Sequence, residues 1–138
     1  MEKTTIVVHS GDLDKILSAL IIGNGFLAMG DEVTLYFTFW GLQRLMKGKL
    51  SKAPLSKMNF FGLGAWWMKK KMKREGVATP ERLMADFKAL GGRIIACEMT
   101  MEVMGISREK LDANLIDEFG AVGMYVDESK KSQRTLFI

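Results

Sequence analysis

The sequence has a single cysteine, Cys97, and a single histidine, His9, among its 138 residues. One cysteine cannot form a disulfide within the chain, and it leaves no CxxC pair or Cys/His cluster for structural zinc. The reaction cycles of thioredoxins and two-cysteine peroxidases are excluded within one chain, because they need a resolving cysteine. Cys97 must therefore act alone or with another molecule, and we expect no metal centre.

Long hydrophobic runs are also absent. No apolar stretch approaches the roughly 20 residues that span a bilayer, and the N-terminal MEKTTIVVHS lacks the basic start, long apolar stretch and cleavage site of a secretory signal. The 48% of apolar residues are enough to build one core. We therefore expect a single cytoplasmic domain over residues 1–138.

Acidic residues are missing from one long stretch of the chain. From Val33 to Arg74 there are ten Lys and Arg and no Asp or Glu, so the rest of the chain carries a net charge of −6. The same stretch holds all three tryptophans, Trp40, Trp66 and Trp67. A basic, aromatic segment on an acidic body predicts a partner or interface surface, although simply solvated lysines are an equal alternative. We expect no nucleic-acid partner.

Apolar runs alternate with segments that carry helix signals. We expect strands at residues 4–10, 31–41 and 93–97, a brief strand after Gly120 and a terminal strand ending at Ile138. We expect helices at 11–30, 65–76, 79–92, 107–120 and 124–132. The expected helix starts are Ser10 or Asp12 for the first, Thr79 with Pro80 for the third and Ser107 for the fourth.

Strands separated by helices predict an α/β fold with a mostly parallel sheet covered by helices on both faces, a three-layer arrangement. Sites in such folds gather beyond the carboxyl ends of the strands. Residues 9–12, residues 39–41 and Cys97 each follow or close a strand. They are therefore predicted to lie on one edge of the sheet. The glycine-rich GNGFLAMG and GLGAWW do not follow strands, so neither fits a nucleotide fingerprint.

Cys97 closes the third expected strand, within RIIACEMTMEVMGI (93–106). A free cysteine is commonly a small buried hydrophobic residue. At the carboxyl end of a parallel strand, beside a helical turn, its sulfur would instead lie near unpaired backbone N–H groups that favour the thiolate. Glu98 and Glu102 oppose this effect, so the direction of the pKa shift stays open. Core residue and nucleophile are both consistent with the sequence.

Other residues near Cys97 also fit either a structural or a functional role. Met101 and Met104 fall on the same helical face as Cys97 and would give it an apolar wall, although such spacing more commonly marks a core. His9 could act as a base toward Cys97 if the strand ends lie side by side. A hydrogen-bonded histidine at a strand end is the simpler interpretation, and Asp12 is more simply a helix cap than an acid or base.

A lone nucleophilic sulfur can still accept a sulfur atom as a persulfide, or a thiosulfonate, and pass it to a thiolate on another protein. That chemistry needs neither a metal nor an organic cofactor. Two other functions fit the same residues. One is a non-enzymatic oligomeric binding protein with a buried, structural Cys97, and the other is a one-cysteine thiol peroxidase.

Three long stretches resemble the DsrE/DsrF-like sulfur-transfer family, in particular its stand-alone branch labelled peroxiredoxin-like. They are HSGDLDKILSALIIGNGFLAMGDEVTLYFTFWGL, LSKMNFFGLGAWWMKKKMKREGV and IIACEMTMEVMGI. The resemblance implies a mainly parallel sheet of about five strands and assembly into oligomers, with a homo-oligomer of three, four or six subunits expected here. It places the transferred sulfur on Cys97 and implies TusA-like and rhodanese-like carrier proteins as partners.

The resemblance also extends the site and assigns the basic segment. The candidate substrate-binding residues around Cys97 are His9, Ser10, Asp12, Phe39, Trp40, Gly41, Met99, Thr100, Met101 and Met104. Residues 42–76, called here the basic aromatic segment, resemble an insertion typical of the branch. Within it, Phe61, Ala65, Met68 and Met72 predict a narrow helical seam that leaves Trp66 and Trp67 outside. We expect an oligomer interface or docking surface there, with membrane-surface contact as the alternative, formed by Phe60, Phe61, Trp66, Trp67, Met68 and Met72.

Overall fold

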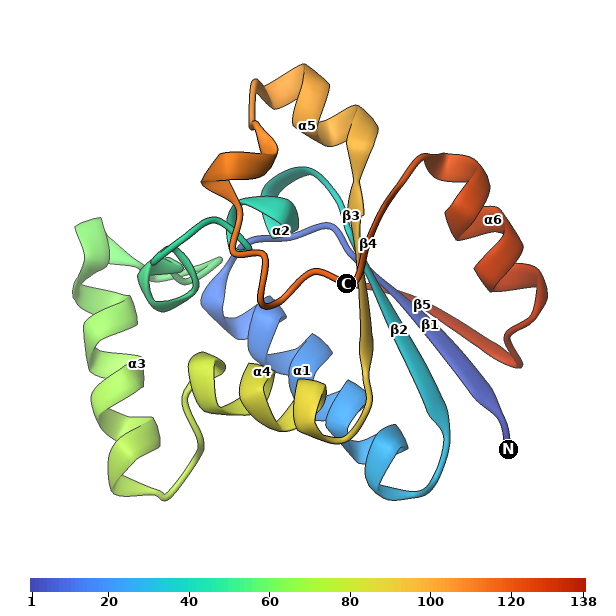
Figure 1. Ribbon diagram of the computed structural model, residues 1–138. Coiled ribbons are helices and arrows are strands. Elements are labelled where there is room, and N and C mark those ends of the chain that lie inside the picture. The colour runs from blue at the N-terminus through green and yellow to red at the C-terminus, as the bar shows by residue number, and fades with distance from the viewer.

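Five parallel strands form the central sheet of the computed structural model, which describes all 138 residues. The strands are β1 (Lys3–Val8), β2 (Glu32–Phe37), β3 (Arg93–Cys97), β4 (Glu118–Gly120) and β5 (Arg134–Phe137). Their order across the sheet is β4-β3-β2-β1-β5, and every neighbouring pair is parallel. All strands therefore end at one edge, as the sequence predicts (Figure 1).

Helices cover both faces of this sheet, which confirms the expected α/β architecture. The helices are α1 (Leu13–Ala28), α2 (Phe39–Gln43), α3 (Leu63–Arg74), α4 (Pro80–Ala89), α5 (Glu98–Met104) and α6 (Val122–Lys130). Helices α1 and α4 lie on one face, α6 lies on the other, and α5 extends β3 beyond the carboxyl edge (Figure 1). None of these helices is both long and apolar enough to cross a bilayer.

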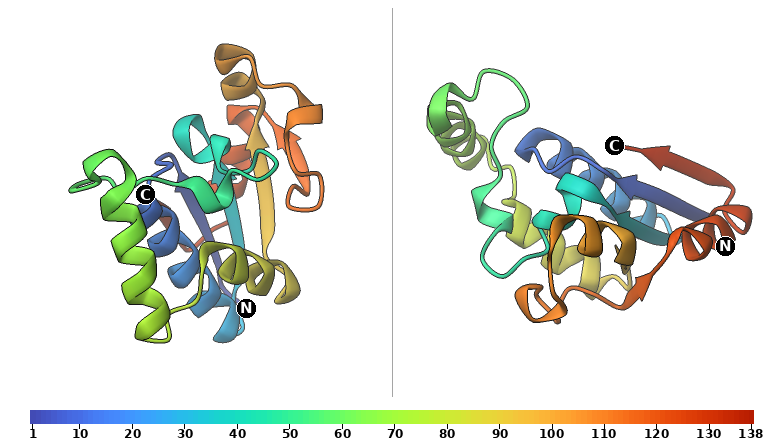
Figure 2. Two further views of the ribbon diagram at one scale, coloured as in Figure 1. Left: turned by 90° about the vertical axis from the view of Figure 1, so that its left-hand side faces the viewer. Right: turned by 90° about the horizontal axis from the view of Figure 1, so that it is seen from above.

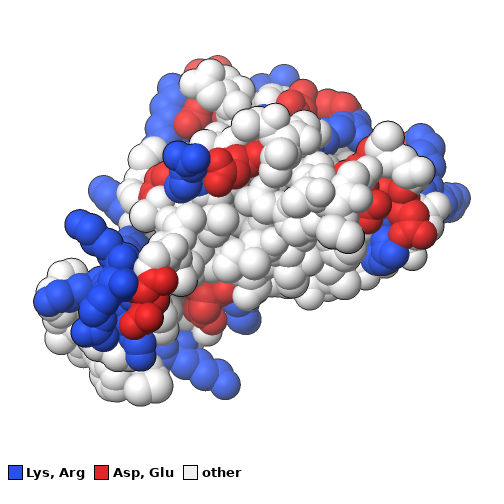
Figure 3. All heavy atoms as spheres, turned by 90° about the horizontal axis from the view of Figure 1, so that it is seen from below, with Lys and Arg blue, Asp and Glu red and all other residues white.

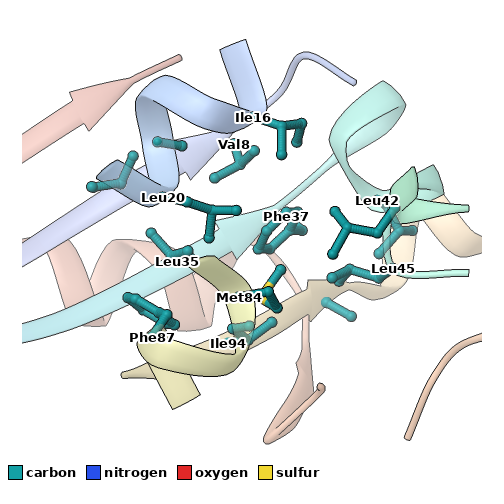
Figure 4. Close-up of a cluster of buried hydrophobic side chains, with 14 of the residues drawn as sticks. Val8, Ile16, Leu20, Leu35, Phe37, Leu42, Leu45, Met84, Phe87 and Ile94 are labelled. Carbon is teal, nitrogen blue, oxygen red and sulfur yellow. The ribbon is translucent and has the colours of Figure 1, made fainter. Parts of the chain in front are cut away.

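The main core lies between the sheet and the pair α1 and α4 (Figure 4). It comprises 18 buried residues, among them Leu35 and Phe37 of β2 with Phe87 of α4. Alternate residues of a strand point to opposite faces, so a smaller cluster forms under α6 from Val7, Tyr36, Ile95 and Cys97. Both faces of β2 are thus buried, in keeping with its continuous apolar sequence.

Helix α3 lies outside α1, away from the sheet (Figures 1 and 2). A cluster of five buried residues holds it there: Leu13, Leu17, Ala53, Ala65 and Met72. Ala65, Met68 and Met72 form the inward seam that the spacing predicts. Phe61 does not belong to that seam, because it lies in the turn before α3 and is fully exposed.

The structure shows the hydrogen bonds at two of the predicted helix starts, Thr79 and Asp12. The Thr79 side chain accepts a hydrogen bond from the Arg82 N–H, with Pro80 at the first helical position, as expected for a capped helix. Asp12 occupies the N-cap of α1, but its side chain makes no capping hydrogen bond. The Leu13 N–H donates to the Pro54 carbonyl instead.

The helix predicted over 107–120 is wrong. Only a short 3₁₀ turn forms there, over Arg108–Lys110, and the strand expected after Gly120 lies earlier, as β4. Hydrogen bonds with a distant segment and within a local turn replace those that a helix would form. Leu111 pairs with Met46 across an isolated bridge, and the Asp112 carboxylate accepts the Asn114 N–H, which favours a turn over a helix. Strand bounds also shift: the expected 31–41 ends at residue 37, because α2 begins at Phe39.

Candidate functional site around Cys97

Cys97 is the last residue of β3 and the N-cap residue of α5. Its side chain is only 2% exposed and packs with Val7, Tyr36 and Ile95 on the face that α6 covers. Met124 and Tyr125 of α6 pack against this cluster. The thiol is therefore at the carboxyl edge of the sheet but beneath α6.

Hydroxyl groups surround the sulfur, although its immediate neighbours in the sheet are apolar. Burial on its own raises the pKa of the Cys97 thiol. The hydroxyls of Thr100, Tyr36 and Thr38 and the Thr100 N–H outweigh that effect and bring the pKa of the thiol below its ordinary value, although none of them makes a hydrogen bond of full geometry to the sulfur. The structure thus decides the direction that the sequence left open, and it favours the thiolate.

The two threonines share their protons in a way that leaves one for the sulfur. Thr38 Oγ1 and Thr100 Oγ1 lie 2.9 Å apart and are hydrogen bonded, and the Phe39 N–H donates to Thr100 Oγ1 at 3.0 Å. Two hydroxyls carry two protons, and only one is used between them. The other proton is free for the sulfur. Both threonines are buried, so water does not compete for it.

Tyr36 contributes the third hydroxyl and has no other partner. Its side chain is 5% exposed, and the phenolic oxygen makes no hydrogen bond of full geometry within the protein. Burial raises the pKa of Tyr36, and its interaction with Cys97 raises it further. The phenol therefore stays protonated and available as a donor to a charged sulfur.

Sequence reasoning found Cys97 and Thr100 but missed Tyr36 and Thr38. Both were included in an apolar strand without a role. The usable signal is the period-two run of hydroxyl residues in TLYFT, where Thr34, Tyr36 and Thr38 alternate with apolar side chains. Alternation places all three on one face, which is the face of Cys97.

His9 does not meet Cys97. It follows β1, and β2 lies between β1 and β3, so two strand spacings, about 10 Å, separate the strand ends. The imidazole instead packs between the rings of Phe39 and Phe137, with centroids 5.3 and 5.4 Å away. Its backbone N–H donates to the Ile138 carbonyl. The structure therefore shows an aromatic contact at a strand end rather than a base beside the sulfur.

Four sequence candidates, His9 among them, line a separate polar hollow. His9, Ser10, Asp12 and Trp40 surround a cavity of about 460 Å³, together with basic side chains that include Lys15 and Arg44. The sulfur of Cys97 does not line it. The two loops thus reach the predicted edge of the sheet but form a hollow of their own.

Gly41 is required by the backbone at this edge. A Cβ atom there would lie 2.2 Å from the carbonyl oxygen of Val8, and one on Gly11 would lie 2.4 Å from that of Trp40. The Gly41 N–H donates to the His9 carbonyl at 2.9 Å. Close packing of α2 against the end of β1 and the loop that follows it explains both glycines without a ligand.

The methionines close to Cys97 in the sequence do not pack on the same face of the sheet as its sulfur. Met101 belongs to the main core, and Met104 packs against that core. Cys97 belongs to the cluster beneath α6, so these two methionines do not form the wall expected around it. Met99 is half-exposed on α5. The apolar cover of the sulfur comes from Met124 of α6 instead.

The residues expected to form an interface fall into two groups. Phe60, Phe61, Trp66 and Trp67 are exposed, by 53 to 109%. Met68 and Met72 pack inward against α1, so they hold α3 in place and do not face outward.

Comparison with known proteins agrees with this fold and extends over the whole chain. A sequence model of the DsrE/DsrF/DrsH-like family matches residues 1–53 and 43–137. The uncharacterized protein YrkE of Bacillus subtilis (strain 168) is 34% identical, with 99% of this chain and 97% of YrkE covered. The sulfur carrier protein DsrE2 of Allochromatium vinosum is 28% identical, with 99% of this chain and 98% of DsrE2 covered.

Two solved structures have a similar fold. The YchN protein of E. coli superposes with a TM-score of 0.67 at 14% identity and covers 100% of both chains. MTH1491 of Methanobacterium thermoautotrophicum, a protein of unknown function, has a TM-score of 0.66 at 11% identity over 99% of both chains. At such low identity these two similarities concern the fold. With the family match over nearly every residue, they lead to one conclusion: the chain belongs to the DsrE/DsrF/DrsH-like family.

Proposed function

We propose that this protein is a sulfur carrier that holds a sulfur atom on Cys97 and exchanges it with thiols of partner proteins. Membership of the family and the likeness to a sulfur carrier protein support a sulfur-transfer role. The observation that carries the assignment to Cys97 is its hydroxyl environment. Tyr36, Thr38 and Thr100 lower the pKa of a thiol that burial alone would keep protonated.

The reaction needs only a thiolate and its donors. The Cys97 thiolate attacks the outer sulfur of a donor persulfide, R–S–SH. A Cys97 S–S bond forms as the donor S–S bond breaks, and the donor leaves as the thiolate RS⁻. An acceptor thiolate then attacks the outer sulfur on Cys97, and the Cys97 thiolate is regenerated. Hydroxyl donors stabilise the negative sulfur before and after transfer without a metal or an organic cofactor.

The proposed partners are small carrier proteins of the TusA-like or rhodanese-like kind, which would supply or accept the sulfur as a persulfide or thiosulfonate. We propose a cytoplasmic setting, since a reducing compartment keeps a free thiol reduced. Assembly into a homo-oligomer stays a prediction.

The test is intact mass spectrometry after incubation with a persulfide or polythionate donor. Wild-type protein is expected to gain a sulfur adduct that a reducing thiol removes, and Cys97→Ser is expected to gain none. An equal adduct on Cys97→Ser would exclude the proposal. Native mass spectrometry of the same samples reports the number of subunits.

Two further measurements separate the alternatives. A one-cysteine peroxidase should consume peroxide with an external thiol and lose this activity in Cys97→Ser. A purely structural Cys97, which its burial would also fit, should take up no sulfur from any donor.

A further inference from the structure

The outward side of α3 presents a continuous stripe that no other part of the chain covers. Its exposed residues recur at helical spacing: Leu63, Trp66, Trp67, Lys70, Lys71 and Arg74. They lie opposite the seam that packs on α1. We call these six residues the α3 outer face. Its first half is apolar and its second half is basic.

The turn before α3 adds an apolar tip, defined here as Met58, Phe60 and Phe61. These side chains are 73%, 64% and 109% exposed. All three residues have positive φ angles, 58°, 45° and 57°. That conformation is costly for bulky side chains, so the turn holds apolar groups outward at the expense of local stability.

Positive charge adjoins this apolar surface along the second half of α3. Figure 3 shows Lys and Arg gathered at the end of the molecule where α3 terminates. The Lys70 and Lys71 ammonium groups lie 5.2 and 5.3 Å from the ring centroids of Trp66 and Trp67. Tryptophan rings with lysines beside them are typical of surfaces at a membrane–water interface.

We propose that the apolar tip and the α3 outer face dock onto the surface of an anionic bilayer. Tip side chains would enter the boundary between headgroups and acyl chains, while Lys70, Lys71 and Arg74 would meet lipid phosphates. A hollow of about 690 Å³ beside the tip, lined mainly by apolar side chains such as Leu55 and Trp66, offers further room for acyl chains.

The charges favour a bilayer over a second copy of the chain. Twofold pairing through this surface would place one basic stripe against another, with like charges facing each other. The α3 outer face itself holds no Asp or Glu, and the Glu75 carboxylate, 3.9 Å from Arg74, offsets only part of its charge. The tip also projects outward, and a fluid bilayer can accommodate a protrusion without a preformed pocket.

Vesicle sedimentation with the full chain tests the proposal. Vesicles of phosphatidylcholine with phosphatidylglycerol are expected to bind the protein, and vesicles of phosphatidylcholine alone are expected to bind it weakly. Added salt should weaken binding, because it screens the charges. In a Trp40→Phe background, all tryptophan fluorescence comes from Trp66 and Trp67, and this emission should shift to the blue on binding.

Variants assign the effect to this surface. Lys70→Gln with Lys71→Gln should lower the partition coefficient roughly 30-fold. Lys110→Gln with Lys130→Gln removes two exposed lysines elsewhere and should change it little. Phe61→Ser with Trp67→Ser should also abolish the fluorescence shift without unfolding, because both side chains are exposed. Cys97→Ser should bind as the wild type does, so this proposal does not depend on sulfur transfer.

Three results would overturn the proposal. The first is no binding of wild-type protein to anionic vesicles. The second is an equal loss of vesicle binding in the Lys70/Lys71 and the Lys110/Lys130 double variants. The third is self-association that disappears in Phe61→Ser with Trp67→Ser while vesicle binding is absent, since that result would make another copy the occupant.

Discussion

The hydroxyl and N–H groups that lower the pKa of Cys97 are uncharged. Hydroxyl groups stabilise a thiolate less than a fixed cation would, but they also adapt to a sulfur atom that is added or removed. Each hydroxyl can rotate its proton toward a new acceptor. At the scale of one residue, uncharged hydroxyl groups suit the proposed role of Cys97, which is to bind a sulfur atom and release it.

Tyr36→Phe should raise the pKa of Cys97, because the sulfur loses a neighbouring hydroxyl group that favours the thiolate. It should leave stability unchanged or raise it by up to about 1 kcal/mol, since it removes a buried hydroxyl without a full partner. Thiolate ultraviolet absorbance against pH and urea denaturation measure the two effects. Tyr125→Phe, whose ring packs 5.4 Å from that of Tyr36, is the matched control. An unchanged titration midpoint in Tyr36→Phe would show that its hydroxyl does not reach the sulfur.

Gly41→Ala should destabilise the fold by about 3 kcal/mol, because the new methyl group would overlap the Val8 carbonyl. Urea denaturation gives the free energy of unfolding. Gly25→Ala serves as the control, since Gly25 lies within α1 with no atom near its Cβ position. That change should be neutral or stabilising by about 0.5–1 kcal/mol. Equal effects in the two variants would argue against the close contact between α2 and the end of β1.

At the scale of elements, α6 is the cover of Cys97, and one carboxylate attaches it to the sheet. Glu128 is 5% exposed and pairs with Lys3 at 2.5 Å and Arg93 at 2.7 Å. Burial raises the pKa of Glu128, but the hydrogen bonds and charges of these partners lower it overall. The proposed sulfur exchange with a partner protein would require this cover to open, because the thiol is otherwise buried.

Glu128→Gln should reduce the free energy of unfolding by about 3 kcal/mol at neutral pH. The folded-state pKa lies below the ordinary value of 4.5, so the stabilisation is complete above that pH and is lost as pH falls through the lowered value. Wild type and variant should therefore converge in acid. Urea denaturation at several pH values measures this. The control Asp127→Asn, on an exposed pair with Lys131, should cost less than about 0.5 kcal/mol throughout.

The same variant should expose the thiol. If α6 opens more often without its carboxylate, iodoacetamide should alkylate Cys97 several-fold faster in Glu128→Gln than in wild type or Asp127→Asn. Timed mass spectrometry follows the reaction under native conditions. An unchanged rate would mean that reagents reach the sulfur by a path that α6 does not control.

The sequence predicts elements well where local signals act and poorly where distant contacts decide. Thr79 and Pro80 mark the start of α4 because their effects are confined to one turn. The missing helix at 107–120 had similar signals, yet pairing of Leu111 with Met46, 65 positions away in the chain, outweighs them. The order of the strands is likewise decided by tertiary contacts. The sequence could therefore place His9 and Cys97 on the same edge of the sheet, but it could not show that β2 lies between their strands.

At the scale of the whole molecule, the apolar cluster that holds α3 is much smaller than the main core. The main core contains 18 buried residues, whereas the cluster between α1 and α3 contains five. Less burial means less free energy opposing local opening. The proposed membrane-binding surface therefore sits on the more weakly held part of the chain, and Cys97 sits on the sheet.

Native-state hydrogen exchange should reveal this division. Amides of α3, residues 63–74, are expected to exchange faster than those of β1, β2 and β3, since α3 can detach without disrupting the main core. Met72→Ala, in the cluster between α1 and α3, should accelerate amide exchange in α3 and leave exchange in the strands unchanged. Met84→Ala, in the main core, should instead lower protection throughout the molecule. If Met72→Ala accelerated exchange equally in strands and α3, the two clusters would form one cooperative unit, and membrane docking of α3 would then act directly on the stability of the sheet around Cys97.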